Sequence, residues 1–332
     1  MPDNLPLFEP MVLAGVVEKL PAPAALTMTN RLPKRSHPFP VAAWDVIGGS
    51  RQVAKPNVPN SEAHIVPTHG MSQETASFIY TREKKTFQPT TLHWLRKPGT
   101  VANLEKAEEA VLREVRDLNL RVDNYVEWCA WQALTGQIVI DTPQVQAVVD
   151  YKFPASHKPT VSTSWASATP QQIVDDVTAW KRLISRDGRV IGKEAYVTDL
   201  TMSRVFRAFA AGAANLLSDR SKDEYYRSGT LPGFLQMDWN IVDSYYDLDD
   251  GTAAGFLPDD AIVLGNFDEG RPFEILEGPT ADDEAPEGYT GKFSKSWKSP
   301  DPSSRQILLE YHFLPVITRP EQFVYVGDVA PG

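Results

Sequence analysis

Cysteine is almost absent from this chain of 332 residues, and Cys129 is the single example. One thiol excludes an intramolecular disulfide framework and a zinc site built from several cysteines, and it fits a reducing compartment. Long hydrophobic runs are also missing. The run MVLAGVV is too short to cross a bilayer, and the acidic, proline-rich MPDNLPLFEP before it lacks the basic start of a secretory signal. We therefore expect a soluble protein that is made in the cytoplasm.

Positive charge is scarce as well. The chain has 33 lysines and arginines against 43 aspartates and glutamates, which gives a formal net charge of -10. This balance disfavours general adhesion to nucleic acid or to anionic membranes, although it leaves room for a local basic patch.

The short motifs of common enzymes are missing too. The sequence contains no Walker loop, dinucleotide glycine fingerprint, nucleophile elbow or HExxH. His64 and His69 lie close together without a nearby cysteine, which favours surface polar residues over a metal site. Cys129 falls on an apolar stripe and is expected to be a buried structural thiol. We predict no catalytic residue, no metal ion and no cofactor.

Clustered carboxylates leave one alternative open, a glycan-active acidic hydrolase that uses paired carboxylates among some of the 8 tryptophans and 11 tyrosines. The stretch FLPDDAIVLGN places Asp259 and Asp260 before an apolar run, so it is either an acidic site or a turn followed by a core strand. A second group, Asp249-Asp250-Gly251, predicts a hairpin turn rather than a calcium loop. A third run is flanked by prolines and predicts a solvated loop: Asp282, Asp283, Glu284 and Glu287.

Proline, in contrast, is abundant, with 27 in the chain and eight of them in residues 1–40. This spacing permits one short helix from Pro10 to Leu20 and otherwise prevents a continuous helix or a central strand. We expect residues 1–40 to form an extended arm that buries little of itself.

Residues 41–96 have a β-like pattern with an unusually long irregular stretch inside it. AAWDVIGG and SFIYTREKKTF predict two strands, and about twenty-five residues rich in Pro, Asn and Gly separate them, far more than a usual connection. We interpret this region as a long protruding hairpin. Its cations are expected to face acidic surface on a neighbouring subunit: Arg51, Lys55, Arg82, Lys84 and Lys85.

The strongest pattern predicts one long helix over residues 103–135. Apolar residues recur there at alternating steps of three and four, Asn103 is a plausible N-cap and Gly136 ends the helix. The apolar stripe comprises Leu104, Ala107, Val111, Val115, Leu118, Val122, Tyr125, Cys129 and Ala133.

The remainder mixes strands and helices without regular alternation, which predicts an α+β fold. Thr169-Pro-Gln-Gln predicts a capped helix start, and further helices are expected over about 201–211 and 213–217. Strands are expected in AIVLGN, RPFEILEG, RQILLEYHFL and EQFVYVGDV.

Two segments carry a resemblance to a known family. FLPDDAIVLGN resembles the FLPD-x-x-x-VLGN segment of the phage lambda-type major capsid protein, the protein E family. The later KSWKSPDPSSRQILLEYHFLPVITRPEQFVYV is similar to that family's K-x-W…DP…PL…PD-x-F-V-x-V ending. The resemblance is strong from about Trp239 to Val329 and weak in the arm and the long loop.

This resemblance implies the Hong Kong 97-type capsid fold. It implies an N-terminal arm at 1–40, an E-loop at 41–96, a P-domain at 97–163 with the spine helix at 103–135, an A-domain at 164–287 and a return to the P-domain at 288–332. It implies no catalytic role.

By the same resemblance the chain is a major capsid protein of the virion. Copies of it would form hexamers and pentamers of an icosahedral shell that encloses double-stranded DNA without sequence-specific binding. Further partners admitted by the resemblance are a decoration protein, a scaffold and a portal.

Overall fold

The computed structural model describes most of the chain. The described residues are 15, 17, 20, 22–47, 71–88, 107–143, 145–210, 217–229, 231, 233–248, 250–301 and 303–329. Among them, no helix combines the length and the apolar character that a membrane span requires.

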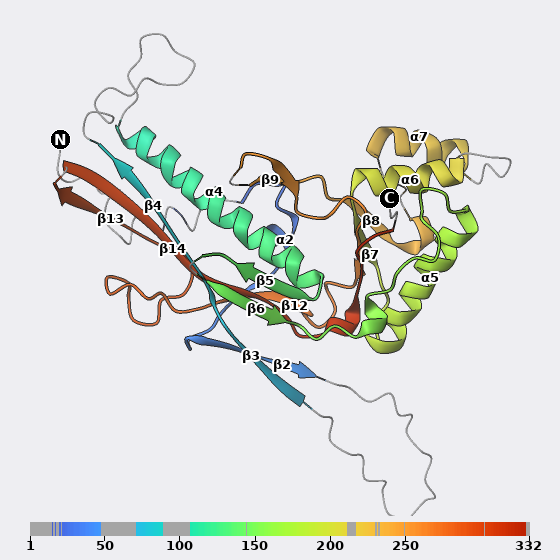
Figure 1. Cartoon of the computed structure of the whole chain (residues 1–332), viewed down its shortest axis with the longest axis horizontal. Coiled ribbons are helices and arrows are strands. Elements are labelled where there is room, and N and C mark those ends of the chain that lie inside the picture. The colour runs from blue at the N-terminus through green and yellow to red at the C-terminus, as the bar shows by residue number, and fades with distance from the viewer. Residues whose placement is uncertain are drawn as a thin grey trace, which may run out of the picture.

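A long helix packs along a five-stranded sheet, in roughly the same direction as its longest strands (Figure 1). The helix, α4 (Ala107–Leu134), confirms the predicted element within the described residues, and Asn103 falls outside them. Its stripe is buried at Val115, Leu118, Val122 and Cys129. The sheet runs β1-β12-β14-β13, and β4 also pairs with β14. These strands are Lys34–Ser36, Phe273–Glu277, Ser303–Ile317, Phe293–Pro300 and Ile79–Phe87.

A second, four-stranded sheet separates two hydrophobic cores. Its order is β15-β11-β7-β8, with bounds Phe323–Val326, Ile262–Gly265, Glu194–Val197 and Asp238–Ile241. On β7, Tyr196 belongs to the core under α4, whereas Ala195 and Val197 belong to the second core. That second core also contains residues of α5 (Pro170–Asp187) and α6 (Asp199–Ala210). The capping box predicted at Thr169 is present at the start of α5.

Three hairpins form small sheets of their own. β2 (Val41–Ile47) pairs with β3 (Met71–Ser77), and this ribbon projects away from the body (Figure 1). β5 (Gln137–Asp141) pairs with β6 (Gln146–Asp150). β9 (Tyr245–Asp247) pairs with β10 (Ala253–Gly255), which confirms the predicted hairpin, while Asp249 falls outside the described residues.

Some elements differ from the sequence predictions. The arm contains a helix, α2 (Thr27–Arg31), whose Met28 is fully buried, so the expectation that the arm buries little of itself is wrong for this part. A helix not predicted, α7 (Asp219–Ser228), follows α6. The helix expected at 213–217 falls mainly outside the described residues. Short 3-10 turns occur at Ala155–His157, Phe234–Gln236 and Pro320–Gln322.

The expected domain ranges remain predictions. Two strands, however, pair with strands on the other side of the expected boundary at residue 287. β12 precedes it and yet pairs with β14 in the five-stranded sheet. β15 follows it and yet pairs with β11 in the four-stranded sheet. The chain therefore passes between the two sheets more than once.

Candidate assembly surface

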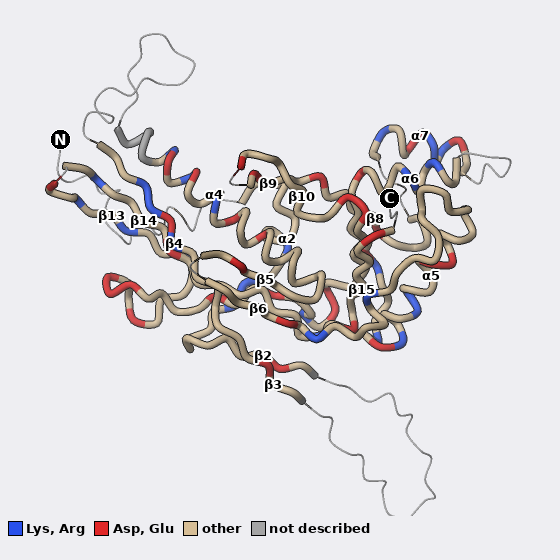
Figure 2. Tube along the Cα trace, viewed as in Figure 1, with Lys and Arg blue, Asp and Glu red and all other residues tan. Residues whose placement is uncertain are grey.

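Three of the five cations predicted to contact a neighbour lie on β4, and Arg51 and Lys55 fall outside the described residues. Basic residues of β4 lie beside acidic residues of α4 (Figure 2). Nζ of Lys85 pairs with Glu114 and lies 2.6 Å from Oδ2 of Asp117. The Lys84 side chain is exposed.

Arg82 has partners in its own chain as well. Its guanidinium lies 3.8 Å from Oδ2 of Asp282 and 3.8 Å from Oε2 of Glu310. Because Arg82 and Lys85 face acidic groups within the subunit, a neighbour is not required to balance their charge. Contact of this set with another subunit therefore stays a prediction, and Lys84 is the member best placed to make it.

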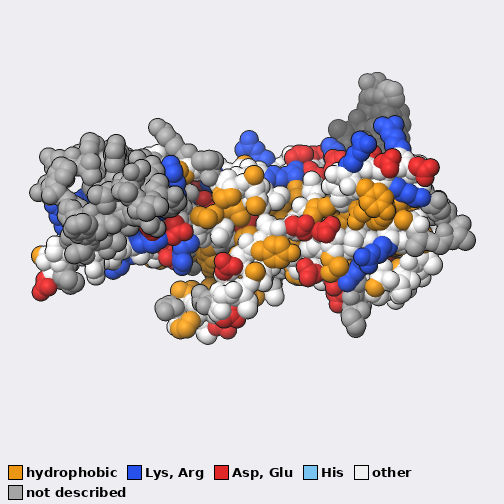
Figure 3. Space-filling model, turned by 90° about the horizontal axis from the view of Figure 1, so that it is seen from above, with side chains coloured by type: hydrophobic (Ala, Val, Ile, Leu, Met, Phe, Trp, Pro, Cys, Tyr) orange, Lys and Arg blue, Asp and Glu red, His pale blue; other side chains and the backbone are white. Residues whose placement is uncertain are grey.

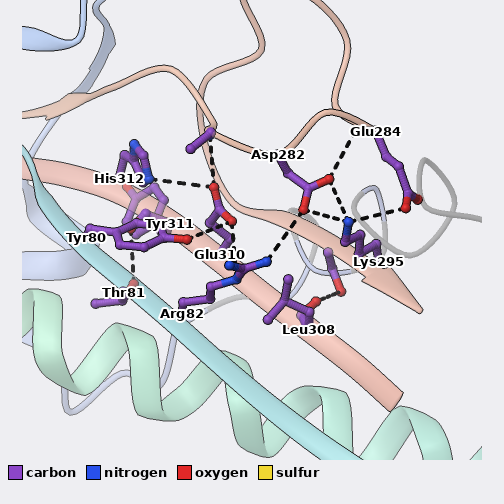
Figure 4. A network of polar contacts seen from close by, with 12 residues as sticks. Tyr80, Thr81, Arg82, Asp282, Glu284, Lys295, Leu308, Glu310, Tyr311 and His312 are labelled. Atoms are coloured by element: carbon purple, nitrogen blue, oxygen red, sulfur yellow. Dashed lines mark hydrogen bonds and ion pairs between the residues drawn. The ribbon is translucent and has the colours of Figure 1, made fainter. Parts of the chain in front are cut away.

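The buried carboxylate of Glu310 lies at the centre of a polar network beside the N-terminal half of β4 (Figure 4). It accepts hydrogen bonds from the Ala281 amide at 3.0 Å and from the Tyr80 hydroxyl at 3.1 Å. Burial raises the pKa of Tyr80, and the charge of Glu310 raises it further. Burial also lowers the pKa of His312, although the nearby Glu310 opposes that shift. Glu310 thus fixes a loop, a strand and an aromatic side chain at one point.

Asp282 corrects the prediction of a solvated acidic loop, because its side chain is only 3% exposed. Nζ of Lys295 lies 2.7 Å from Oδ2 of Asp282 and 3.2 Å from Oε1 of Glu284. Burial would lower the pKa of Lys295, but its hydrogen bonds to Asp282 and Glu284 raise it. Asp282, Asp283 and Glu284 are close enough together to hold a metal ion. The Lys295 ammonium already occupies the position of their counter-cation (Figure 4).

The stretch FLPDDAIVLGN is a turn followed by a core strand, as one of its two interpretations predicted. Asp260 pairs with Arg204, while the backbone carbonyl of Asp259 accepts hydrogen bonds from the hydroxyls of Thr198 and Thr201 at 2.5 and 2.7 Å. The turn therefore binds the start of α6. The Asp260 carboxylate therefore has a structural role, whereas the Asp259 carboxylate is exposed and takes no part in these contacts.

Gly265 and Asn266, which end this stretch, both have structural roles. A Cβ on Gly265 would lie 2.9 Å from Cε1 of Phe323 and closer still to Cδ1, so only glycine permits this approach. Asn266 is buried, and its Oδ1 accepts from the amides of Asp268 and Glu269 at 3.1 and 3.2 Å. Both residues shape the fold without contacting a candidate site.

Glu127 is an important residue that sequence reasoning missed. It lies within α4, is fully buried, and accepts hydrogen bonds from the amides of Met28 and Thr29 at 2.9 and 2.7 Å. It also accepts from the Thr29 hydroxyl at 2.9 Å and from Nε1 of Trp131 at 2.8 Å. Four donors compensate the cost of burying one carboxylate. Three of these four donors come from the arm, about a hundred residues earlier, so helix periodicity gives no sign of the contact.

The exposed surface mixes side chains of all kinds. Figure 3 shows apolar side chains interspersed with charges of both signs over the described part of one face. Exposed large apolar residues are spread over several elements, including Val148 on β6, Tyr226 on α7 and Tyr245 on β9. Single exposed apolar residues are normal for a folded protein, so this distribution alone marks no docking site.

Comparison with known proteins identifies the family. The sequence model of phage major capsid protein E matches residues 10–326. No curated protein sequence matches the chain. Among solved structures, a prophage capsid protein from Escherichia coli CFT073 is 17% identical, with a TM-score of 0.58 over 78% of this chain and 79% of that one.

Two other structures share the fold. A phage-related protein from Bordetella bronchiseptica RB50 is 10% identical, with a TM-score of 0.57 over 98% of this chain and 99% of that one. A chain of the satellite phage P4 procapsid, solved with the size determination protein, is 10% identical. Its TM-score is 0.53 over 96% of this chain and 90% of that one. At these identities the likeness establishes the fold alone, and it is the Hong Kong 97-type capsid fold. The family match covers nearly the whole chain, so the chain belongs to the phage major capsid protein E family.

Proposed function

We infer that this chain, as a member of the major capsid protein E family, is a structural subunit of a phage capsid and not an enzyme. We propose that copies of this chain form hexamers and pentamers, and that these close into an icosahedral shell around a double-stranded DNA genome. The subunit would be made in the host cytoplasm before it enters the virion. Its net charge of -10 supports this role, because an acidic shell encloses DNA without adhering to it.

The β2–β3 hairpin is the observation that carries the proposal. It is a separate two-stranded sheet that projects from the body, and an isolated two-stranded ribbon is marginally stable in water. One end of the ribbon is anchored in the body, where Ala42 and Trp44 join the main core and Glu74 pairs with Lys152 at 2.6 Å. The unpaired backbone edges of the ribbon are suited to pairing with a neighbouring subunit.

Accessory partners form a finer part of the proposal. The P4 procapsid chain is solved with a size determination protein, which supports an accessory protein during assembly. We infer a scaffold during assembly, a portal at one vertex and a decoration protein on the outer surface. Co-purification of shells from cells that express the whole set of phage structural genes would test each partner separately.

Shortening the hairpin tests the proposal directly. Ile47 and Met71 lie opposite each other in the ladder, so an Asn-Gly turn can replace residues 48–70 without changing the register of β2 and β3. We expect this variant to fold with an unchanged far-UV circular dichroism spectrum but to form no closed shells in electron microscopy. A control variant keeps the length of the parent chain but has glycine and serine in place of the residues at 48–70. It shows whether assembly depends on the sequence of this segment or only on its length. Normal shells from the shortened variant would refute the role of the hairpin.

A further inference from the structure

Helix α2 begins without a cap of its own. Leu26 stands at its N-cap position and provides no side-chain hydrogen bond. A helix of five residues cannot persist alone, because nucleation is costly and its first amides lack partners. Glu127 of α4 provides the missing acceptor to Met28 and Thr29. The first turn of α2 therefore depends on α4.

The other end of α2 is fixed to a different part of the molecule. Arg31, its last residue, makes a two-pronged contact with Glu194 on β7, and its second nitrogen lies 2.5 Å from Oε1. It also donates to the Tyr196 hydroxyl, and its Cζ lies 4.8 Å from the centre of the Phe267 ring. Burial would lower the pKa of Arg31, but Glu194 raises it, so the guanidinium stays charged. Forked arginine–carboxylate pairs fix orientation as well as distance.

These contacts close into a ring. The Tyr196 hydroxyl donates to Glu194 at 3.0 Å, and its ring meets the Trp131 ring edge to face at 5.7 Å. Trp131 in turn donates to Glu127. The circuit runs from α4 through α2 to β7 and back to α4, at the place where the four-stranded sheet meets the core under the long helix.

We propose that α2 is a latch: held by Glu127 at one end and by Arg31 at the other, it fixes the angle between α4 and the four-stranded sheet. The aromatic contacts at this junction join Trp131 to Tyr196 and Tyr196 to Phe267. The polar contacts of α2 add bonds that fix both distance and direction. Opening the latch at either end releases the whole of this short helix.

The arm provides a matched control for the Arg31 pair. Arg35, on β1, also forms a pair with a carboxylate, and its nitrogens lie 2.7 and 2.8 Å from Oε1 of Glu274. Glu274 is on β12, the strand with which β1 pairs. This second arginine–glutamate pair therefore lies within one sheet and does not span the junction.

Hydrogen exchange of the native subunit tests the latch. Arg31→Met should raise the exchange of the Met28 and Thr29 amides, at the far end of α2, and of the β7 amides by about tenfold or more. Arg35→Met should leave those amides within about twofold of the parent rate. If Arg31→Met changes these amides no more than Arg35→Met does, the latch is wrong. Should Arg31→Met fail to fold, Arg31→Lys keeps the charge, removes the fork and is judged by the same amides.

A double variant tests whether the two ends act as a unit. Either change alone opens the latch, so Glu127→Gln combined with Arg31→Met should raise exchange little beyond the larger single effect. Glu127→Gln combined with Arg35→Met should multiply the two single effects. Independent, multiplicative effects in both pairs would overturn the latch.

One consequence rests on the proposed function. If the angle at this junction sets the curvature of the shell, Arg31→Met should give shells of mixed diameter in electron microscopy, whereas Arg35→Met should give uniform ones. Uniform shells from Arg31→Met together with raised exchange would refute the link to curvature and keep the latch. A parent chain that forms no shells would refute the proposed function, and the exchange data would still decide the latch.

Discussion

Asp259 and Asp260 are adjacent in sequence, and they differ in what holds them. Asp260 pairs with Arg204 through its carboxylate, whereas the Asp259 side chain is exposed and only its backbone carbonyl is bound. Asp260→Asn should therefore lower the free energy of unfolding by up to about 1 kcal/mol, the usual scale of a partly exposed ion pair. Asp259→Asn is the matched control and should be neutral. Urea unfolding measures both, and a larger loss at position 259 would contradict this assignment.

Asp187, at the end of α5, gives the molecule a specific sensitivity to acid. Hydrogen bonds from Arg186 lower the pKa of this carboxyl from 3.8 to about 2; partial burial opposes the shift and His157 adds to it. The unfolded chain then binds this proton at a higher pH than the folded chain does. The stabilisation by Asp187 is complete above pH 3.8 and is lost as pH falls towards 2.

Replacing this carboxyl should remove that pH dependence. Asp187→Asn is expected to flatten the fall in unfolding free energy between the ordinary pKa of 3.8 and the shifted pKa of about 2. Arg186→Gln removes the main cause of the shift and should flatten the fall in part. Unfolding curves collected at several pH values provide the measurement, and an unchanged slope in Asp187→Asn would show that other carboxyls are responsible.

Single residues also show what the sequence could and could not reveal. The periodicity of α4 predicted that Val115, Val122 and Cys129 are buried, because burial of a helix face depends on local spacing. Glu127 lies off this stripe and is equally buried, because its donors come from α2. The solvated loop predicted at Asp282 is wrong at this residue for the same physical reason, because its partner Lys295 comes from strand β13. Pairing between distant segments leaves no periodic signal.

The long helix permits a test at the scale of an element. Val122 is 2% exposed and Leu120, two positions earlier on the same helix, is 37% exposed. Val122→Asp would bury an unpaired charge, which costs several kcal/mol, roughly 3–5, and should prevent soluble expression. Leu120→Asp should fold, with a change within about 1 kcal/mol. Expression level and thermal unfolding measure the difference, and assembly of Val122→Asp into normal shells would place the helix outside the core.

Elements with a strong local pattern were predictable, and the others were not. The apolar spacing along α4 and the capping box of α5 both depend only on residues that are close together in the sequence. Helix α7 has no buried residue, so it leaves no apolar period in DRSKDEYYRS. Strand β13, which the sequence patterns did not predict, carries Lys295, Trp297 and Lys298 among small residues and lies at a sheet edge. Helix α2 forms among prolines because α4 caps it.

At the scale of the whole molecule, the two sheets are interlocked by chain connectivity. β11 belongs to the four-stranded sheet, β12 to the five-stranded one, and β15 returns to the first. A change in the angle between the sheets must therefore be absorbed in the short connections 266–272 and 318–322. This interlocking limits how far the subunit can deform, and it makes the junction held by α2 a point where small changes would affect the shape of the subunit.

The two neighbouring lysines of β4 distinguish contacts within the subunit from contacts between subunits. Lys85 pairs with Glu114 and Asp117 on α4, so Lys85→Glu should lower the free energy of unfolding by about 1 kcal/mol or more through like-charge repulsion. The exposed Lys84 has no comparable role in the fold, so Lys84→Glu should leave unfolding unchanged. If this strand faces acidic surface on a neighbour, Lys84→Glu should reduce shell formation, and the loss should be greatest at low salt, where exposed charges are least screened. Light scattering at two salt concentrations measures assembly, and shells that form equally well from Lys84→Glu at both would remove Lys84 from the interface.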